Sequence, residues 1–460
     1  MSEQSLFSEF EAVSAKAWKQ KIQYELKGAD YNEKLVWESP DGIKVKPFYN
    51  REDLKGLDIV DTTDLSTWKI AEAIFVADVS KSNKKALQVL DLGAESIFFE
   101  VTSETTEPQQ LFTGIDTNAV PVHLSLHFLS PLYTGKVLKT LGAPSPNLHL
   151  HCDPIGHLAG TGNWFTDMPT DLEQLQQTVA LVGDQPVGSL FSVDTALYQQ
   201  AGATMVQQLA YALGHANEYL NRYTANPFPG LLFKVAVGGN YFFEIAKLKA
   251  LRLLWKALAA EYGVATDCHI LATPSRRNKT IYAYNNNMLR STAECMSAIL
   301  GGADTVNNLP YDSLYHKNNT FGDRIARNQL LLLKYESYFK GLPQPVKGSY
   351  YIETLTRQLA EKALALFKTI EAAGGFLQQL KDHTIQRKIK ESAEKEQSLF
   401  DAGKEVLIGT NRYLHRQEHM RDNLDLYPFV KTHARKTLIE PIIPKRLAEV
   451  MEQKRLQDEN

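Results

Sequence analysis

A regular alternation of short apolar segments and longer amphipathic segments runs through the middle of the sequence. The short segments are residues 70–78, 96–102, 120–128, 148–155, 188–195, 231–239, 266–274 and 303–310. A segment with helical periodicity follows each of them. Strand followed by helix, repeated eight times, predicts an α/β fold of the closed parallel (β/α)8 (TIM) barrel type. An open doubly wound sheet is the alternative, and the lack of a glycine-rich phosphate-binding motif after any early strand favours the barrel.

The segments that flank this alternation differ from it. Residues 1–60 predict an extended N-terminal arm: one helix within EFEAVSAKAWKQKIQYELKG, then an extended piece, KLVWESPDGIKVKPFYN. That piece carries Trp37, Val45, Phe48 and Tyr49, with little neighbouring sequence to bury them. We therefore expect the arm to pack on another surface and to make the contact with a partner subunit. The barrel is expected over residues 61–340 and a C-terminal helical cap over residues 341–460.

The overall composition excludes several classes of partner. The formal net charge is −3, so bulk electrostatics do not indicate a nucleic-acid partner. No apolar run reaches the ~20 residues of a membrane helix, and the N-terminal residues MSEQSLFSEFEAV lack the pattern of a secretory signal. The three cysteines are too far apart to predict a disulfide framework. We expect a cytoplasmic protein.

Catalytic side chains of barrel enzymes stand at the C-terminal ends of the strands, the mouth of the barrel. Residues 192–204, SVDTALYQQAGAT, offer only Leu197 and Tyr198 after Asp194 at one such end. We predict that single aspartates at strand ends are helix caps, because no acid/base pair is visible. A basic loop at this rim, SRRNKT (275–280), is expected to be solvated. The other candidates at strand ends are Asp78, Thr102, Ser103 and Asp153.

The phase of the strands predicts an unusual barrel interior. In VPVHLSLHF the apolar residues share one face and the polar residues the other, and in LHLHCD two leucines oppose two histidines. The apolar faces should meet the outer helices, so the polar faces should fill the lumen. We interpret these residues as a hydrogen-bonded structural network rather than a metal site, and we predict a filled lumen. The predicted lumen residues are Glu100, His123, Ser125, His127, His149, His151, Lys234, Asp267 and His269.

Four long stretches carry a resemblance. They are AGATMVQQLAYALGHANEYL, NYFFEIAKLKALRLLW, NNNMLRSTAECMSAILGGADTVNNLPYD, and RIARNQLLLLKYES followed by GSYYIETLTRQLAEKALALFKTIEAAGG. On these stretches the chain resembles the methylmalonyl-CoA mutase family from Trp18 to the C-terminus. The resemblance implies a barrel threaded by acyl-CoA, joined to a C-terminal cobalamin domain, that rearranges a carbon skeleton with adenosylcobalamin.

The sequence departs from that family in four places. We expect no cobalamin domain, because the chain ends where one would begin, and DCHILA (267–272), with Ala272 in place of glycine, is a chance likeness to a cobalt-ligand motif. No Arg-Pro-Trp stretch precedes the first strand. The catalytic histidine of the family aligns with Leu197. An arginine that helps to hold CoA aligns with Gly230.

The family contains heterodimers in which a small subunit lacks the active-site residues, and NYFFEIAKL and NMLRSTAECMSAILGGADT look closest to small subunits. The resemblance therefore implies a small, non-catalytic subunit of methylmalonyl-CoA mutase, inactive alone. Adenosylcobalamin is expected on the catalytic large subunit, and no catalytic, cofactor-binding or metal-ligating residue is expected in this chain.

Two alternatives remain open at this point. One is a catalytic acyl-CoA mutase barrel that uses a separately encoded cobalamin-binding chain, for which Tyr198 and Tyr49 would be the nearest candidate groups. The other is a homo-oligomeric CoA-binding or scaffold protein.

Overall fold

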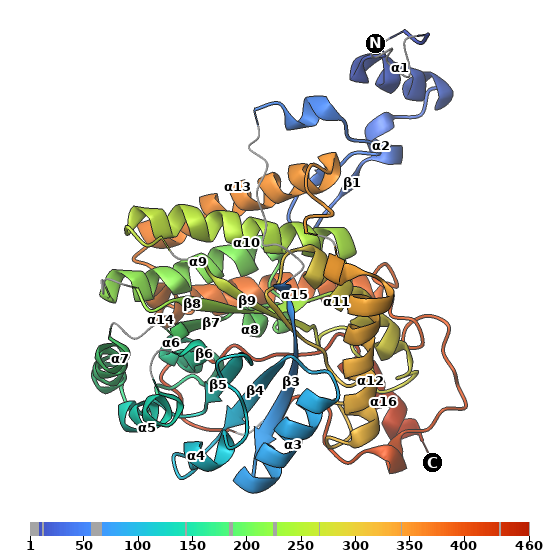
Figure 1. The fold of residues 1–460 in the computed structure, drawn as a ribbon. Coiled ribbons are helices and arrows are strands. Elements are labelled where there is room, and N and C mark those ends of the chain that lie inside the picture. The colour runs from blue at the N-terminus through green and yellow to red at the C-terminus, as the bar shows by residue number, and fades with distance from the viewer. Residues whose placement is uncertain are drawn as a thin grey trace, which may run out of the picture.

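The fold is a closed eight-stranded parallel barrel, as the alternation predicts (Figure 1). The computed structural model describes residues 9–11, 13–56, 67–142, 145–183, 187–223, 228–265, 267–341, 343–431 and 434–459. The strand order around the barrel is β10-β3-β4-β5-β6-β7-β8-β9. The strands are β3 (Lys69–Val76), β4 (Ser96–Val101), β5 (Val122–Leu126), β6 (Ser145–Cys152), β7 (Val187–Asp194), β8 (Leu231–Val237), β9 (His269–Pro274) and β10 (Thr305–Asn307).

Helices surround the barrel and bury the outward faces of its strands. They are α3 (Val79–Asp91), α4 (Pro108–Leu111), α5 (Pro131–Leu141), α6 (Pro154–Thr161), α7 (Met168–Val182), α8 (Thr195–Gln200), α9 (Met205–Arg222), α10 (Tyr241–Glu261), α11 (Asn286–Leu300) and α12 (Thr320–Leu331). Ile97, Phe99, Leu124 and Leu150 face these helices and are 0% exposed. The predicted phase of the strands is therefore confirmed.

A third layer covers α9 and α10. The long helix α13 (Tyr350–Ala372) packs across both of them on the outside of the barrel (Figure 1). This layer buries charged residues of α10, and they are paired: Lys249 Nζ lies 2.8 Å from Glu353 Oε1 of α13. Lys247 Nζ donates to the Ala236 carbonyl oxygen at 2.8 Å and pairs with Glu244. A helix enclosed on both sides needs such pairs, because an unpaired buried charge is strongly destabilising.

The N-terminal arm has two parts with different environments. Residues 37–54, which include the short hairpin strands β1 (Trp37–Glu38) and β2 (Lys44–Val45), pack on this chain's own helices. Ile43 is 2% exposed, and the Tyr49 ring lies 5.0 Å from that of Tyr351 on α13. The expectation that the whole arm awaits another surface is wrong for this part, because α9, α10 and α13 together provide the surface that local sequence lacks.

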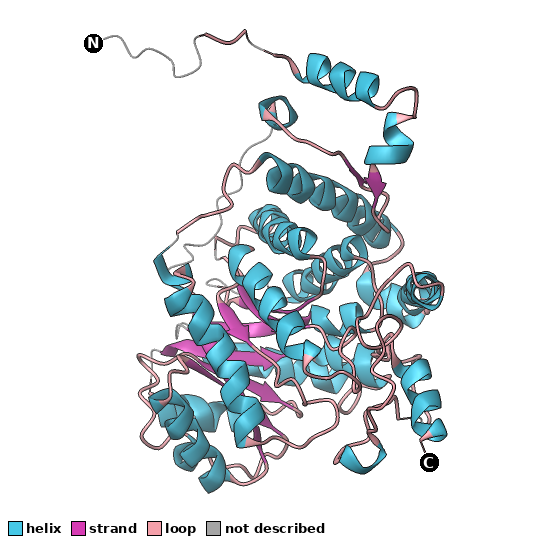
Figure 2. Cartoon of the chain, turned by 90° about the vertical axis from the view of Figure 1, so that its right-hand side faces the viewer, coloured by secondary structure: helices cyan, strands magenta, loops and turns pink. Residues whose placement is uncertain are grey.

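The first part of the arm projects from the body (Figures 1 and 2). It holds α1 (Ala15–Glu25) and the short α2 (Tyr31–Leu35). Helix α1 has no buried residue, and Trp18 and Tyr24 are 50% and 81% exposed. This part therefore keeps the exposed apolar side chains that the sequence predicts for a contact with another chain.

The C-terminal region covers the mouth of the barrel on the side of β6, β7 and β9. Helices α14 (Phe376–Lys381) and α15 (Thr384–Asp401) precede a segment of irregular backbone, and α16 (Glu449–Asp458) follows it. We call residues 434–448 the strap. Its backbone N–H groups donate to carbonyl oxygens at the mouth: Ile442 to Ala159 in α6, Lys445 to Gln200 at the end of α8, and Leu447 to Arg277 in the loop after β9, at 2.8–3.1 Å. The predicted C-terminal helices are therefore present, and the strap adds an irregular segment that crosses the mouth.

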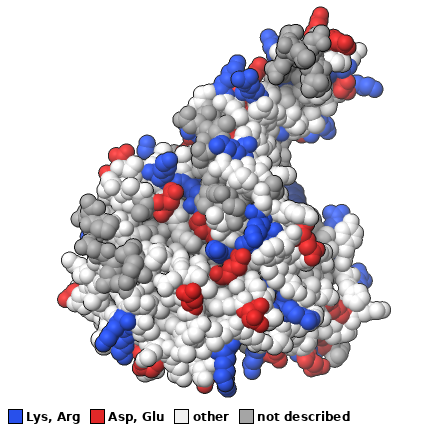
Figure 3. Space-filling view, in the orientation of Figure 1, with Lys and Arg blue, Asp and Glu red and all other residues white. Residues whose placement is uncertain are grey.

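Charges of both signs alternate over the face of the molecule shown in Figure 3. None of the helices described by the structure combines the length and the apolarity that crossing a membrane requires.

Gly230, just before β8, provides a test of this packing. It has φ +79°, and a Cβ atom there would lie 2.8 Å from the Gly188 carbonyl oxygen. We expect Gly230→Ala to destabilise the chain by about 1–2 kcal/mol for the left-handed backbone, plus about 1–3 kcal/mol for the contact with rigid backbone. Gly263→Ala is the matched control, because Gly263 has φ +68° and open space around it. Urea unfolding of both variants should show the difference, and equal losses would contradict this account.

Candidate functional site

The aspartates at the strand ends are helix caps, as predicted. Asp78 Oδ1 accepts from the Lys81 N–H at 2.8 Å, Asp153 Oδ1 from Gly156 at 2.7 Å and Asp194 Oδ1 from Leu197 at 3.3 Å. Each carboxylate thus satisfies a backbone donor of the helix that follows its strand. Besides the backbone N–H group that it caps, each of Asp153 and Asp194 also binds a second group.

Asp153 anchors a buried chain of polar groups that runs outward from the mouth. His215 Nε2 of α9 lies 2.9 Å from Asp153 Oδ1, and Tyr219 donates its hydroxyl to the same oxygen at 2.7 Å. Burial alone would raise the pKa of Asp153, but His215, the Tyr219 hydroxyl and the Gly156 N–H lower it below its usual value. His215 Nδ1 lies 2.9 Å from the Tyr198 hydroxyl oxygen. This network joins α6, α8 and α9 and faces the helices, not the mouth.

Leu197 stands in α8 directly after β7, at the mouth. It is partly buried and packs against the main apolar core. Its side chain faces Gly160 of α6, where a Cβ atom would lie 3.5 Å from Leu197 Cδ2. The strap is bonded to Gln200 at the end of the same helix. The surroundings of Leu197 are therefore those of a packing residue.

The two tyrosines that a catalytic barrel would need lie elsewhere. Tyr198 is 0% exposed, and burial raises the pKa of its hydroxyl well above its ordinary value. Its hydroxyl is engaged with His215. Tyr49 lies on the outer layer against Tyr351 of α13, and its hydroxyl oxygen accepts from the Lys46 N–H at 3.1 Å. Neither phenol stands beside Leu197 as a donor at the mouth.

The basic loop after β9 is not solvated, contrary to the expectation for residues 275–280. Arg277 is 5% exposed and donates to Glu396 of α15 and to the Lys445 carbonyl oxygen of the strap, both at 2.7 Å. Lys279 Nζ lies 2.6 Å from Glu294 Oε2, and both side chains are buried. Because these cations are paired inside the protein, only Arg276 of the three basic side chains in this loop is exposed.

The lumen contains a cluster of imidazole rings. The rings of His123 and His149 are stacked with centroids 4.5 Å apart, and that of His269 lies 4.1 Å from His149. His151 Nε2 lies 3.3 Å from His123 Nδ1. Phe98, whose ring lies 5.2 Å from that of His151, occupies the adjacent part of the lumen and forms a small apolar cluster there with Leu232 and Leu271.

The predicted lumen face is confirmed for most of its residues. His123, His149, His151 and His269 meet in the lumen, and Lys234 lies above them, with its Nζ 2.9 Å from Asp194 Oδ2. Glu100 and Ser125 are partly buried. The prediction is wrong for His127 and Asp267, which are exposed because β5 and β9 do not include them. Phe98 also faces the lumen but was not among the predicted residues, although it lies two residues before Glu100 in β4 and so on the same face of the strand.

Burial keeps the lumen imidazoles uncharged. It lowers the pKa of His149 to about 4 and lowers the pKa values of His123, His151 and His269 well below their ordinary range. The neighbouring histidines lower the values of those last three further, because a second positive charge so close is unfavourable.

The residues at the mouth do not fit a corrin ring. A flat macrocycle needs a broad open face, and here the strap crosses the loops after β6, β7 and β9 on backbone hydrogen bonds. Ile439 and Ile442 of the strap are each 3% exposed and belong to the core. His269, the histidine of DCHILA, is the first residue of β9 and points into the lumen, so it is not placed as an external cobalt ligand.

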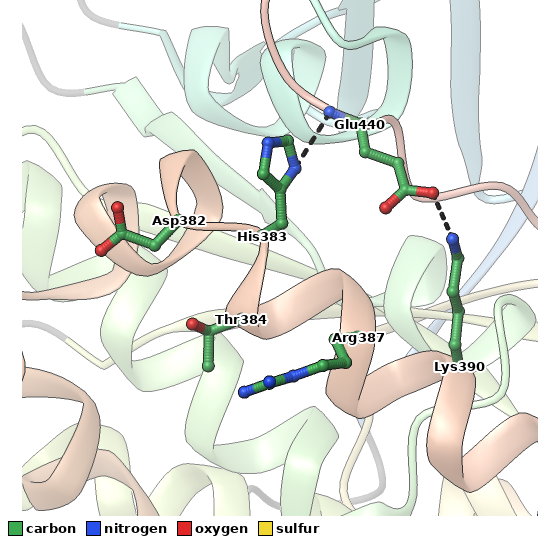
Figure 4. A pocket seen from close by; sticks show the side chains of 6 residues that line it. All are labelled: Asp382, His383, Thr384, Arg387, Lys390 and Glu440. Atoms are coloured by element: carbon green, nitrogen blue, oxygen red, sulfur yellow. Dashed lines mark hydrogen bonds and ion pairs between the residues drawn. The ribbon is translucent and has the colours of Figure 1, made fainter.

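A shallow surface depression lies where the strap meets α15 (Figure 4). The Glu440 N–H of the strap donates to His383 Nδ1 at 3.4 Å, and the Glu440 carboxylate pairs with Lys390. Since Glu440 of the strap bonds to both His383 and Lys390, we interpret this depression as an anchor for the strap. It is lined by Asp382, His383, Thr384, Arg387, Lys390 and Glu440.

Comparison with known proteins gives consistent matches. The family described as methylmalonyl-CoA mutase matches residues 100–453. The methylmalonyl-CoA mutase small subunit of Porphyromonas gingivalis is 33% identical over 92% of this chain and 73% of its own length. The corresponding small subunit of Streptomyces virginiae is 27% identical over 89% of this chain and 72% of its own length. The methylmalonyl-CoA mutase of Cereibacter sphaeroides is 28% identical, and the match covers 89% of this chain but only 66% of that protein.

The neutral lumen histidines predict sensitivity to acid. A histidine whose pKa is lowered in the folded state binds a proton more readily when the chain is unfolded. Its contribution to the free energy of unfolding is therefore complete above about pH 6.5 and is lost as the pH falls. For His149, with a folded pKa of about 4, the loss approaches about 1.4 kcal/mol per pH unit within that window. Urea unfolding of the parent should show stability falling from about pH 7 to about pH 5, with a shallower fall in His149→Gln. The exposed His127→Gln is the control, and an unchanged slope in His149→Gln would contradict the assignment.

Proposed function

Because the chain belongs to the methylmalonyl-CoA mutase family, we propose that it is the small subunit of an adenosylcobalamin-dependent methylmalonyl-CoA mutase. In this proposal the heterodimer interconverts methylmalonyl-CoA and succinyl-CoA, and the catalytic large subunit carries the cofactor. This chain supports the large subunit and does not itself catalyse the isomerisation. Two relatives that carry the small-subunit name match about nine-tenths of the chain, which supports this assignment.

The environment of Leu197 carries the non-catalytic part of the proposal. The resemblance aligns this position with the catalytic histidine of the family. Here the side chain is apolar, packs against the core and faces Gly160 of α6. An apolar side chain in such a setting can neither donate a proton nor stabilise a developing charge.

The lumen and Gly230 support the same conclusion. The resemblance implies that a catalytic barrel leaves its lumen open for the pantetheine arm of CoA, whereas four histidines, Phe98 and Lys234 occupy this lumen. Gly230 aligns with a CoA-binding arginine, and its left-handed backbone and close contact with Gly188 disfavour any side chain.

The direct test of the proposal is co-purification from the native organism, with mass spectrometry to identify the bound protein. We expect a large mutase subunit in equimolar amount. Recovery of homo-oligomers alone would favour a scaffold protein, and recovery of a free cobalamin-binding chain would favour a catalytic barrel.

The projecting part of the arm predicts a contact with the partner subunit. Trp18→Ala combined with Tyr24→Ala removes two rings that are 50% and 81% exposed. Among the described residues, their one contact with another aromatic ring is that of Trp18 with the half-buried Phe48, edge to face at 6.3 Å. We expect this double variant to weaken heterodimer formation and to leave the melting temperature of the isolated chain nearly unchanged. Ile43→Ala is the matched control within the arm, because Ile43 is buried and its truncation should cost about 2–5 kcal/mol of stability.

Binding measured by analytical ultracentrifugation, with melting temperatures on the same samples, distinguishes these effects. Unimpaired assembly of the Trp18→Ala/Tyr24→Ala variant would show that α1 does not contact the partner.

Substitution of Leu197 tests whether this barrel takes part in the chemistry. Leu197→Ala should leave turnover of the reconstituted heterodimer nearly unchanged, because the side chain serves packing. We expect a stability loss at or below the lower end of the range of about 2–5 kcal/mol for buried leucines, since Leu197 is only partly buried. Leu197→His should create no activity in the isolated chain, because catalytic groups that act together give little when one is restored alone.

The assay is methylmalonyl-CoA conversion by the pair and by the isolated chain. If Leu197→Ala abolished turnover while the pair stayed assembled and stable, the chain would be part of the active site and the proposal would be wrong.

A further inference from the structure

Three lumen histidines from different strands bring their ring nitrogens together. His123 of β5, His149 of β6 and His269 of β9 each offer one nitrogen, and the three nitrogens lie within 4.8 Å of one another. A tetrahedral zinc ion with Zn–N bonds of about 2.0–2.1 Å holds its nitrogen ligands roughly 3.3 Å apart. The observed spacing is wider than that of a zinc site, so a ring must rotate for the three nitrogens to bind one ion.

Each of these histidines has a polar partner at a ring nitrogen. His149 Nδ1 lies 3.0 Å from Ser189 Oγ, and His269 Nε2 lies 3.0 Å from Thr305 Oγ1. His123 Nδ1 lies 3.3 Å from His151 Nε2. Metal-binding histidines generally use their second nitrogen in this way, which fixes the tautomer and the ring orientation. With these contacts kept, a metal ion would bind the opposite nitrogen of each ring.

One of the remaining nitrogens is conspicuously unsatisfied. His123 is 0% exposed, and its Nε2 has no hydrogen-bond partner among the residues that the structure describes. A buried polar atom without a partner is destabilising, and a cation held by three imidazoles would satisfy it. The sequence predicted that all three of these histidines face the lumen, but the meeting of their nitrogens depends on the closure of the barrel.

The surroundings favour a transition metal over Mg²⁺ or Ca²⁺. All three donors are imidazole nitrogens, whereas Mg²⁺ and Ca²⁺ prefer oxygen ligands. Burial keeps the rings neutral, which is the form that binds metals. His269 is the first residue of β9 and is partly exposed, so the cluster lies toward the N-terminal end of that strand.

The His123 and His149 rings are stacked, so one of them must change its orientation before both can bind one metal ion. The His123 and His149 rings are inclined by only 11°, and a nitrogen lone pair lies in the plane of its ring. One of the two must therefore tilt about its Cβ–Cγ bond, a torsion with broad minima. The His269 ring is already inclined by 42° to His149 and by 53° to His123.

We propose that His123, His149 and His269 form a binding site for one divalent transition metal ion in the lumen, with nitrogen ligands from three strands. The site is separate from the mouth of the barrel and does not depend on the small-subunit assignment. It would link β5, β6 and β9 across the barrel interior.

The test uses the full chain purified without a polyhistidine tag. Titration with Co²⁺ should give the visible absorption of a tetrahedral site at one equivalent, and Zn²⁺ should displace the Co²⁺ and raise the melting temperature. His269→Ala should weaken binding at least ~10-fold, since loss of an outer partner alone typically costs 10–100-fold. His127→Ala, which removes an exposed histidine outside the lumen, is the matched control and should bind as the parent does.

Thr305→Val keeps all three histidines and removes only the hydroxyl partner of His269. It therefore provides a second measurement of metal affinity if His269→Ala does not fold. We expect it to weaken Zn²⁺ binding about 10–100-fold, with circular dichroism unchanged. Absence of stoichiometric Co²⁺ binding by the parent would overturn the proposal. Equal affinity in the parent, His269→Ala and Thr305→Val would also overturn it and would locate any bound metal elsewhere.

Discussion

The structure depends on how the closed barrel divides the two faces of its strands. Eight parallel strands surrounded by helices must give their apolar faces to those helices, because the helices bury more apolar surface than the narrow lumen can. In β5 and β6 that requirement places Leu124 and Leu150 outside and His123 and His149 inside. The polar lumen is thus a consequence of the outer packing, and the hydroxyls of Ser189 and Thr305 satisfy part of it.

The mouth of the barrel is closed by packed structure. Asp153 and Asp194 each cap a helix and bind a second group, His215 and Lys234 respectively. Arg277 and Lys279 of the β9 loop are neutralised by Glu396 and Glu294. The strap then covers these loops through backbone hydrogen bonds. Of the three basic side chains in that loop, only Arg276 stays exposed.

The arm combines two roles at different points along its length. Its second part, around Ile43, is fixed by the outer helices of this chain, and its first part carries Trp18 and Tyr24 into solvent. The fixed part holds the base of the projecting part against the body, and in the proposed heterodimer this would lower the entropy that the arm loses on docking. Rigidity at the base and exposed rings near the end are the features expected of a segment that joins two subunits.

The sequence by itself determined the barrel, the order of its strands and the inward direction of most lumen residues, because a period of two and alternation with helices are local properties of the chain. It also identified the strand-end aspartates as helix caps, since capping depends on neighbouring residues. Only the tertiary structure decided that His269 joins His123 and His149, that Arg277 and Lys279 are buried, and that His127 lies outside the lumen. Those features depend on where the strands end and on contacts between segments far apart in the chain, such as the contact between the strap and the β9 loop. Such contacts arise when the barrel closes and leave no periodic signal in the sequence.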